Sequence, residues 1–216
     1  MIFDPSTLDR GTLNGLINGL VYPRPIAWVS TLSATGRPNL APFSFFNAFS
    51  FSPPTVAIGP GSRNGVNKDT LRNIRETGEF VVSVVTEDLA KLVNASSAEF
   101  GADVNEWDAL GIAGADCVEV RPKRVAASPA AFECQMLQIV ELGSVDSPGN
   151  SLVLGRVLRI HVDDAALDGT RPLSDTLNLV GRMGGSEWCR TTAKFNLQRP
   201  ASNDPAEVKR ALDEGR

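Results

Sequence analysis

Residues 44–70, SFFNAFSFSPPTVAIGPGSRNGVNKDT, carry the most informative pattern in this 216-residue chain. The segment runs from an aromatic-rich strand end through an apolar strand, Thr55 to Ile58, into a Gly-rich loop and a helix capped by Asn67. Free backbone N–H groups, the helix dipole and Lys68 at one place indicate a site for an anion, and a phosphate is the expected ligand. An ordinary charged helix start in solvent is the alternative that these residues leave open.

Two common nucleotide motifs do not fit this segment. The dinucleotide fingerprint lacks its third glycine, because position 64 is Asn, and a P-loop would need Gly directly before Lys68. A site for a single phosphate remains the expectation. Donors of the loop, Lys68 and the first helical turn would hold the phosphate, and the Asp69 carboxylate would point away from it. The residues of this expected site are Ser62, Arg63, Lys68, Asp69 and Thr70.

Hydrophobic periodicity outside this segment predicts more strands than helices. Helices are expected over Thr7–Leu20, from Lys68 to Gly78, from Thr86 onward and as one turn at Glu106. Strands are expected over Val21–Leu32, Asn39–Phe46, Phe80–Val85, Ala131–Leu142 and Ser151–Val162, with a short element over Leu177–Val180. Two hairpins among these strands favour an antiparallel barrel or sandwich with attached helices over a doubly wound sheet.

The chain is expected to consist of one domain and a short C-terminal tail. Residues 1–200 are expected to form a single domain, and residues 201–216 form a polar tail. Within that tail, Asp204 to Glu207 resembles a capping box with Pro at the first helical position, which predicts a surface helix.

Composition excludes several classes of protein. The net charge of −4 without a basic block argues against nucleic acid, and no apolar run or signal-peptide pattern indicates a membrane, so a cytoplasmic protein is expected. Cys117, Cys134 and Cys189 form no Cys-x-x-Cys pair, so neither a disulfide framework nor a zinc or iron–sulfur site is expected. A single histidine, His161, leaves little material for a catalytic triad or a His-rich metal site.

Four motifs in order carry a family resemblance that covers roughly residues 20–200. They are PRPIAWVST at 23–31, NLAPFSFFN at 39–47, KDT at 68–70 and GRMGG at 181–185. In these motifs the chain resembles the flavin reductase-like family. The resemblance implies a mainly β fold with attached helices, an antiparallel Greek-key split barrel of the FMN-binding type, and a homodimer with FMN near its interface.

The resemblance also implies a set of cofactor-binding residues. Ser30 and Thr31 would lie near the flavin, and Ala41, Ser44 and Asn47 would line its ring and ribityl chain. The phosphate would be surrounded by Ser62, Arg63, Lys68, Asp69 and Thr70, and Arg182 would reach the cofactor or a neighbouring subunit's site. Relatives often carry Tyr after the last motif, where this chain has Trp188, so stacking is retained there and a hydroxyl contact is not.

The chemistry implied by the resemblance is the cofactor's, so no strong acid or base is required of the protein. His161 has two interpretations: an aid to nicotinamide binding or proton transfer at the flavin, or a strand-end side chain packed at the surface. The second is favoured, because no acid–base role follows from its spacing.

The expected activity is that of an NAD(P)H:flavin oxidoreductase, in which bound FMN takes hydride from NAD(P)H and reduces free flavin or another acceptor. A site of single-phosphate size favours FMN over FAD, the sequence favours neither NADH nor NADPH, and a monooxygenase that consumes the reduced flavin is a conceivable partner. The alternatives are an FMN-containing electron carrier or substrate-specific reductase fed by another protein, a non-enzymatic flavin-binding protein, and a barrel oxidase acting on a pyridoxal-type phosphate, which the motifs match less well.

Overall fold

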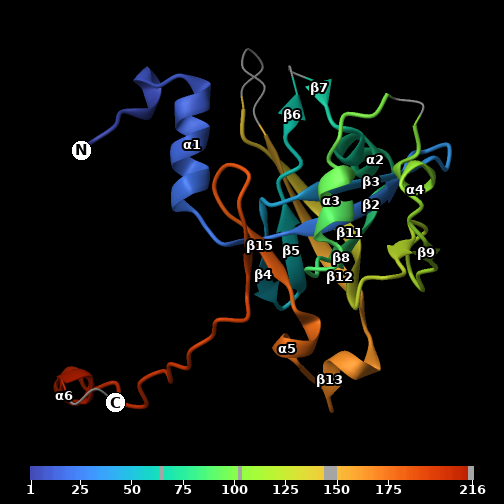
Figure 1. Ribbon diagram of the computed structural model, residues 1–216. Helices are drawn as coiled ribbons and strands as arrows, with labels where there is room; N and C mark the ends of the chain where they lie inside the picture. Colours follow the sequence, from blue (N-terminus) through green and yellow to red (C-terminus); the bar gives the residue numbers. More distant parts are fainter. Residues whose placement is uncertain (64–65, 102–103, 144–149, 214–216) are drawn as a thin grey trace.

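The computed structural model describes residues 1–63, 66–101, 104–143 and 150–213, without the side chains of Arg63 and Val66. Its centre is a seven-stranded antiparallel sheet with the order β3-β2-β8-β11-β12-β5-β4 (Figure 1). The strands of this sheet are β2 Ala27–Leu32, β3 Pro38–Phe43, β4 Phe46–Phe51, β5 Pro54–Ile58, β8 Glu79–Val84, β11 Ala130–Glu141 and β12 Ser151–Val162. The expectation of a mainly β, antiparallel fold is thus confirmed.

Short elements surround the sheet. A second sheet, in the order β1-β15-β16, joins β1 Arg24–Pro25, β15 Val180–Arg182 and β16 Trp188–Arg190. Two-stranded pairs are formed by β6 Ser62–Arg63 with β7 Val66–Asn67, β9 Gly114–Ala115 with β10 Arg124–Val125, and β13 Leu167–Asp168 with β14 Arg171–Pro172. The helices are α1 Arg10–Leu20, α2 Asp69–Thr77, α3 Ala90–Ala95, α4 Glu106–Ala109, α5 Ser174–Leu177 and α6 Pro205–Asp213, with 3-10 turns η1 Pro5–Thr7 and η2 Asp164–Ala166.

Strand β2 separates two apolar cores, because successive side chains of a strand point to opposite faces. Val29 packs into a cluster with Phe80 of β8 and Ile74 of α2. Trp28, fully buried, belongs to a second cluster with Val93 of α3 and Trp107 of α4. Helix α2 therefore covers one face of the sheet while α3 and α4 cover the other, and β2 is buried on both.

The N-cap of helix α2 lies one residue later than expected. Lys68, not Asn67, is the N-cap residue, and its side chain makes no capping hydrogen bond. Asn67 is held in β7 by its pairing with Ser62, which takes it out of the capping position. The helix ends as expected at Gly78, whose φ of 72° is the left-handed conformation that glycine adopts freely.

The aromatic segment is divided differently from the expectation. The predicted return strand Asn39–Phe46 ends at Phe43, and the chain then leaves β2 and enters β4, which pairs with β5. Local alternation continues through the bend, so the sequence pattern does not mark it. Phe43 is buried, whereas Phe45, Phe49 and Phe51 are exposed.

Several smaller expectations have clear outcomes. The hairpin of β11 and β12 is confirmed, although its connection at 144–149 lies outside the described residues. The helix predicted from Thr86 begins only at Ala90, because Thr86 forms a bridge with Leu179 instead.

The predicted tail helix is confirmed as α6, which lies apart from the sheet at the end of an extended segment (Figure 1). None of the helices within the described ranges has the length and apolar composition needed to cross a membrane.

Candidate functional site

A cavity of about 570 Å³ lies where the N-terminal helix, the end of β3 and the Gly181–Gly185 loop meet. Its described lining contains three cationic residues and no carboxylate, so we refer to it as the cationic cavity. Asn14 and Asn18 of α1 contribute amide groups from one side. The remaining lining residues used below are Arg24, Pro42, Phe43, Ser44, Ser62, Lys68, Arg182 and Met183.

Arg24 holds three segments together at the base of this cavity. Its side chain is buried, and Nη1 donates to the carbonyls of Asn18 at 2.8 Å and Val21 at 2.6 Å. Nη2 donates to the carbonyl of Met183 at 2.9 Å, and Nε donates to Ser44 Oγ at 3.4 Å. Burial, and then the neighbouring charge of Arg182, lowers the pKa of Arg24 from its usual value. The guanidinium thus joins α1, β1 and the Gly181–Gly185 loop.

Arg182 is positioned by its own loop and by an aromatic ring. Nη2 donates to the carbonyl of Gly185 at 2.5 Å, and the guanidinium lies 5.5 Å from the ring centroid of Trp188. This is the geometry of a cation–π contact. Trp188 therefore stacks on an arginine in this structure.

A second cavity, of about 630 Å³, lies at the start of α2 and is called the polar cavity here. It shares Pro42, Ser62 and Lys68 with the cationic cavity. The Lys68 ammonium lies 5.3 Å from the ring centroid of Phe43. Asp69 lines the polar cavity, and its carboxylate pairs with Arg72 of the same helix at 2.6 Å.

The structure brings seven of the predicted cofactor-binding residues to these two cavities. They are Ala41, Ser44, Ser62, Lys68, Asp69, Thr70 and Arg182. Thr70 is almost fully buried, and its hydroxyl accepts from Asn39 Nδ2 at 3.0 Å. The side chain of Arg63 lies outside the described part of the structure.

Three other predicted residues do not line either cavity. Ser30 is buried and donates to the carbonyl of Lys123 at 2.5 Å. Thr31 is buried against α2, where its hydroxyl accepts from Asn73 Nδ2 at 3.0 Å. Asn47 is exposed on β4, and its Oδ1 accepts from the Ala48 N–H at 2.8 Å. Ser30 and Thr31 brace the sheet through these contacts.

His161, the weak catalytic candidate, lies near the end of β12 and lines neither cavity. Its Nε2 is 2.5 Å from Oε1 of the buried Glu133. This placement agrees with a strand-end position, and it adds a buried partner that the sequence pattern did not reveal.

Sequence reasoning missed the most connected residue of the site. Arg24 lies in the PRPIAWVST motif without an expected role, and Asn14 and Asn18 lie inside the helix expected over Thr7–Leu20. A charged residue between two prolines at the start of a strand is a weak signal that it needs partners. Those partners are carbonyls at Asn18 and Met183, far from each other in the sequence, and only the fold brings them together.

Comparison with known proteins gives a consistent picture. A family model described as a flavin reductase like domain matches residues 19–179. An uncharacterized protein of Deinococcus radiodurans is 40% identical over 222 residues, which cover 99% of this chain and 96% of that protein. Nitrilotriacetate monooxygenase component B from Bacillus cereus superposes with a TM-score of 0.88 at 27% identity, covering 91% of this chain and 98% of that one. The 2-nitrobenzoate 2-nitroreductase NbaA from Pseudomonas fluorescens superposes with a TM-score of 0.85 at 30% identity, covering 95% and 100%.

Proposed function

Because this chain belongs to the flavin reductase-like family and has its split-barrel fold, we propose that it binds FMN and uses it to reduce an acceptor at the expense of NAD(P)H. The observation that supports this most directly is the pair of adjoining cavities, of which one is lined by three cations and the other adjoins the start of a helix. When bound, FMN would supply the redox chemistry: it takes hydride from the nicotinamide and passes electrons to the acceptor.

The junction of the two cavities fits a phosphate. Lys68 supplies a positive charge, Ser62 supplies a hydroxyl, and the first turn of α2 supplies backbone N–H groups without intrahelical partners. Asp69, the nearest carboxylate on the helix, is neutralised by Arg72. The donor set matches a single phosphate, which favours FMN over FAD.

The cationic cavity fits the isoalloxazine end of the cofactor. Its floor is the end of β3, where Pro42, Phe43 and Ser44 present a compact surface. Arg182, fixed by Gly185 and Trp188, and Arg24 behind it place positive charge beside this surface. Fixed positive charge stabilises the negative charge that builds up in the ring on reduction.

Two kinds of electron acceptor are proposed for the reduced cofactor. The similarity to a monooxygenase component B favours free flavin, delivered to a partner monooxygenase. The similarity to a nitroreductase favours a second candidate, direct reduction of a bound organic acid, and the cationic cavity suits an anionic acceptor.

Anaerobic visible spectroscopy tests the activity. We expect the protein, saturated with FMN, to bleach on adding NADH or NADPH and to recover on adding free FMN or a nitroaromatic acid. Recovery with free flavin supports the flavin reductase, and recovery with the nitroaromatic acid alone supports the second candidate. FMN that stays oxidised with both nicotinamides would contradict the activity while leaving the binding intact.

The phosphate site is tested by Lys68→Ala. Loss of one charge-assisted contact should weaken FMN binding by on the order of 1.5–3 kcal/mol, which is about ten- to hundredfold in Kd. Flavin fluorescence titration measures this, and Lys91→Ala on the exposed side of α3 is the matched control. Equal affinity of the two variants would place the phosphate elsewhere.

A further inference from the structure

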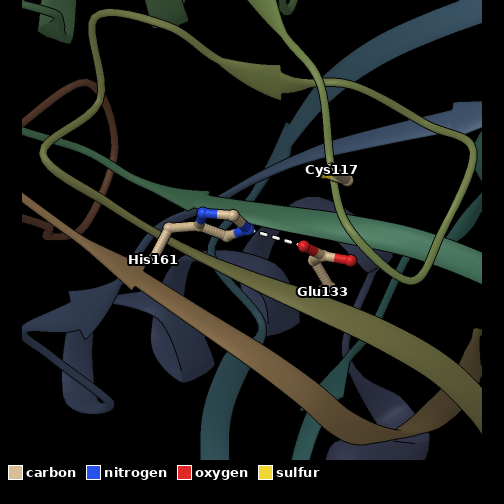
Figure 2. Close-up of side chains that lie close together, drawn as sticks. All are labelled: Cys117, Glu133 and His161. Atoms are coloured by element: carbon tan, nitrogen blue, oxygen red, sulfur yellow. Dashed lines mark hydrogen bonds and ion pairs between the residues drawn. The ribbon is translucent and has the colours of Figure 1, made fainter.

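Cys117, Glu133 and His161 form a cluster of three different metal-ligating side chains away from the two cavities. The ligand atoms of Cys117, Glu133 and His161 all lie within 4.8 Å of one another (Figure 2). None of the three lines the cationic or the polar cavity. We propose that these residues form a three-ligand site for a divalent transition metal of the zinc class, with the fourth position open to water.

The sheet itself brings two of the ligands together. Ala131 of β11 lies opposite His161 of β12, and Glu133 lies opposite Arg159, so Glu133 and His161 are diagonal neighbours on one face. The register shifts between Glu133 and Cys134, which is a bulge of the kind that re-aims side chains. Beyond Arg156, β12 pairs only with β11 among the residues that the structure describes.

The third ligand comes from the loop between β9 and β10, which crosses over this face. Cys117 is half-buried on that loop, and the next three residues point their backbone N–H groups at the Glu133 carboxylate. Val118 donates to Oε1 at 2.8 Å, and Glu119 donates to Oε2 at 2.6 Å. Both oxygens of the carboxylate are thus held in place by backbone N–H donors, and His161 contacts Oε1.

The geometry suits a tetrahedral ion after a small movement. Metal–ligand bonds of about 2.0–2.3 Å place neighbouring ligand atoms roughly 3.3–3.8 Å apart. The His161 Nε2 to Glu133 Oε1 separation of 2.5 Å must therefore open by about 1 Å, while the whole set already lies within 4.8 Å. His161 is the ligand free to move, because Glu133 is fully buried and the His161 side chain is 24% exposed.

The charges of the cluster also match. A thiolate, a carboxylate and a neutral imidazole carry two negative charges, which a divalent cation neutralises. The nearby cations Arg159 and Lys123 are paired with Glu119 and Asp116, and Arg124 faces Cys117. The thiolate is the form of cysteine that ligates a metal, so the metal must displace the Cys117 thiol proton on binding.

A zinc competition titration tests the proposal. The untagged full-length protein, with its flavin retained, is stripped by a chelator and then titrated with Zn²⁺ against a chromophoric zinc indicator. We expect one tightly held Zn²⁺ per chain and at least a tenfold weaker affinity in Cys117→Ser and in His161→Gln. Cys189→Ala, a half-buried cysteine in β16, is the matched control and should bind like the wild type.

A second measurement separates metal ligation from loss of structure. Each variant is checked by far-UV circular dichroism, and Co²⁺ replaces Zn²⁺ in a difference spectrum, where a thiolate-to-cobalt charge-transfer band reports the Cys117 ligand. The band should appear in wild type and Cys189→Ala and be absent in Cys117→Ser. Binding only at large metal excess, equal binding by folded Cys117→Ser, or loss of binding in Cys189→Ala would each overturn the proposal. None of these outcomes bears on FMN binding, so the two proposals fail independently.

Discussion

Gly155 in β12 lies against the ring of Phe80, which is fully buried in β8. A Cβ at this position would stand 2.2 Å from Cζ and 2.8 Å from Cε1 of that ring. Both atoms are in the middle of the core, so the ring has nowhere to go without moving its neighbours.

We therefore expect Gly155→Ala to lower the free energy of unfolding by about 3 kcal/mol, the upper end of the overpacking range. Urea unfolding followed by circular dichroism measures this. Gly19→Ala is the control, because a Cβ there meets nothing within 4 Å and the helix gains about 0.5–1 kcal/mol from the exchange. A stable Gly155→Ala protein would mean that the Phe80 ring has another rotamer available.

Glu106 lines the polar cavity, and one of its carboxylate oxygens accepts from the Leu40 N–H at 3.3 Å. Burial raises the pKa of Glu106 above its usual value of 4.5, with a smaller contribution from Asp69. The folded state therefore binds this proton more tightly than the unfolded state does. Stability from Glu106 is complete below the unfolded pKa and is lost as the pH rises through the folded pKa.

Glu106→Gln removes the ionised, half-buried carboxylate and keeps an oxygen for Leu40. We expect it to raise the free energy of unfolding at pH 7 and to leave it nearly unchanged at about pH 3, where the wild-type carboxyl is protonated in both states. Chemical unfolding at the two pH values measures this, with Glu207→Gln in the exposed α6 as the control for net charge. An equal effect at both pH values would contradict the assignment.

At the scale of elements, α2 is attached to the sheet by buried side-chain amides as well as by apolar contacts. Thr31 Oγ1 of β2 accepts from Asn73 Nδ2 at 3.0 Å and from Asn39 Nδ2 at 3.4 Å. Thr70 Oγ1 accepts from the same Asn39 amide at 3.0 Å. The network fixes the start of α2, and with it Lys68, against β2 and β3.

Thr31→Val keeps the volume of the side chain and leaves the Asn73 amide without its acceptor. We expect a loss of about 1–3 kcal/mol in the free energy of unfolding, the penalty for an unsatisfied buried donor. Thr35→Val in the exposed turn is the control, and thermal unfolding is the measurement. A loss of FMN affinity without any loss of stability would instead support a direct flavin contact at Thr31.

The sequence predicts these elements well where one local signal dominates. A run of β-branched apolar residues identifies β8, hydrophobic patterning identifies β11 and β12, and Gly78 marks the end of α2. It fails at Phe43–Phe46, because the bend from one strand into the next interrupts no pattern, and at Asn67, because pairing within a short hairpin overrides its capping preference. In both places the deciding contact is a strand pairing, of Phe46 with Ile58 and of Asn67 with Ser62, which the pattern of the segment itself does not encode.

At the scale of the whole molecule, β4 is an edge strand with large apolar side chains in solvent. Phe49 is 63% exposed and Phe51 is 94% exposed, on the last strand of the seven-stranded sheet. An exposed aromatic edge favours association. The homodimer stays a prediction, and we expect its interface at the exposed β4 edge with Phe49 and Phe51.

We expect the protein to be a dimer in solution and Phe49→Asp to shift it to a monomer. Light scattering coupled to size-exclusion chromatography measures the mass, and Leu212→Asp, exposed on the distant α6, is the control. A monomeric wild type, or a Phe49→Asp variant that stays dimeric, would contradict this interface.

The sequence predicts only those residues of the candidate site that lie close together along the chain. Ser62 and Lys68 lie within one loop and helix start, so a local pattern points to them. The partners of Arg24 are distributed from Asn18 to Met183, and the cluster around Glu133 joins a loop to two strands. Neither set leaves a local signature, because the first depends on the pairing of β1 with β15 and the second on the register of β11 with β12.

The cationic cavity takes its walls from residues 14 to 185. A growing chain on the ribosome cannot present this cavity until the Gly181–Gly185 loop has been synthesised and has docked on Arg24 and α1. Ligand capture in this cavity is therefore a late event, which requires synthesis of the chain as far as Gly185. Retention of the ligand would report that a given molecule has docked this loop against Arg24 and α1.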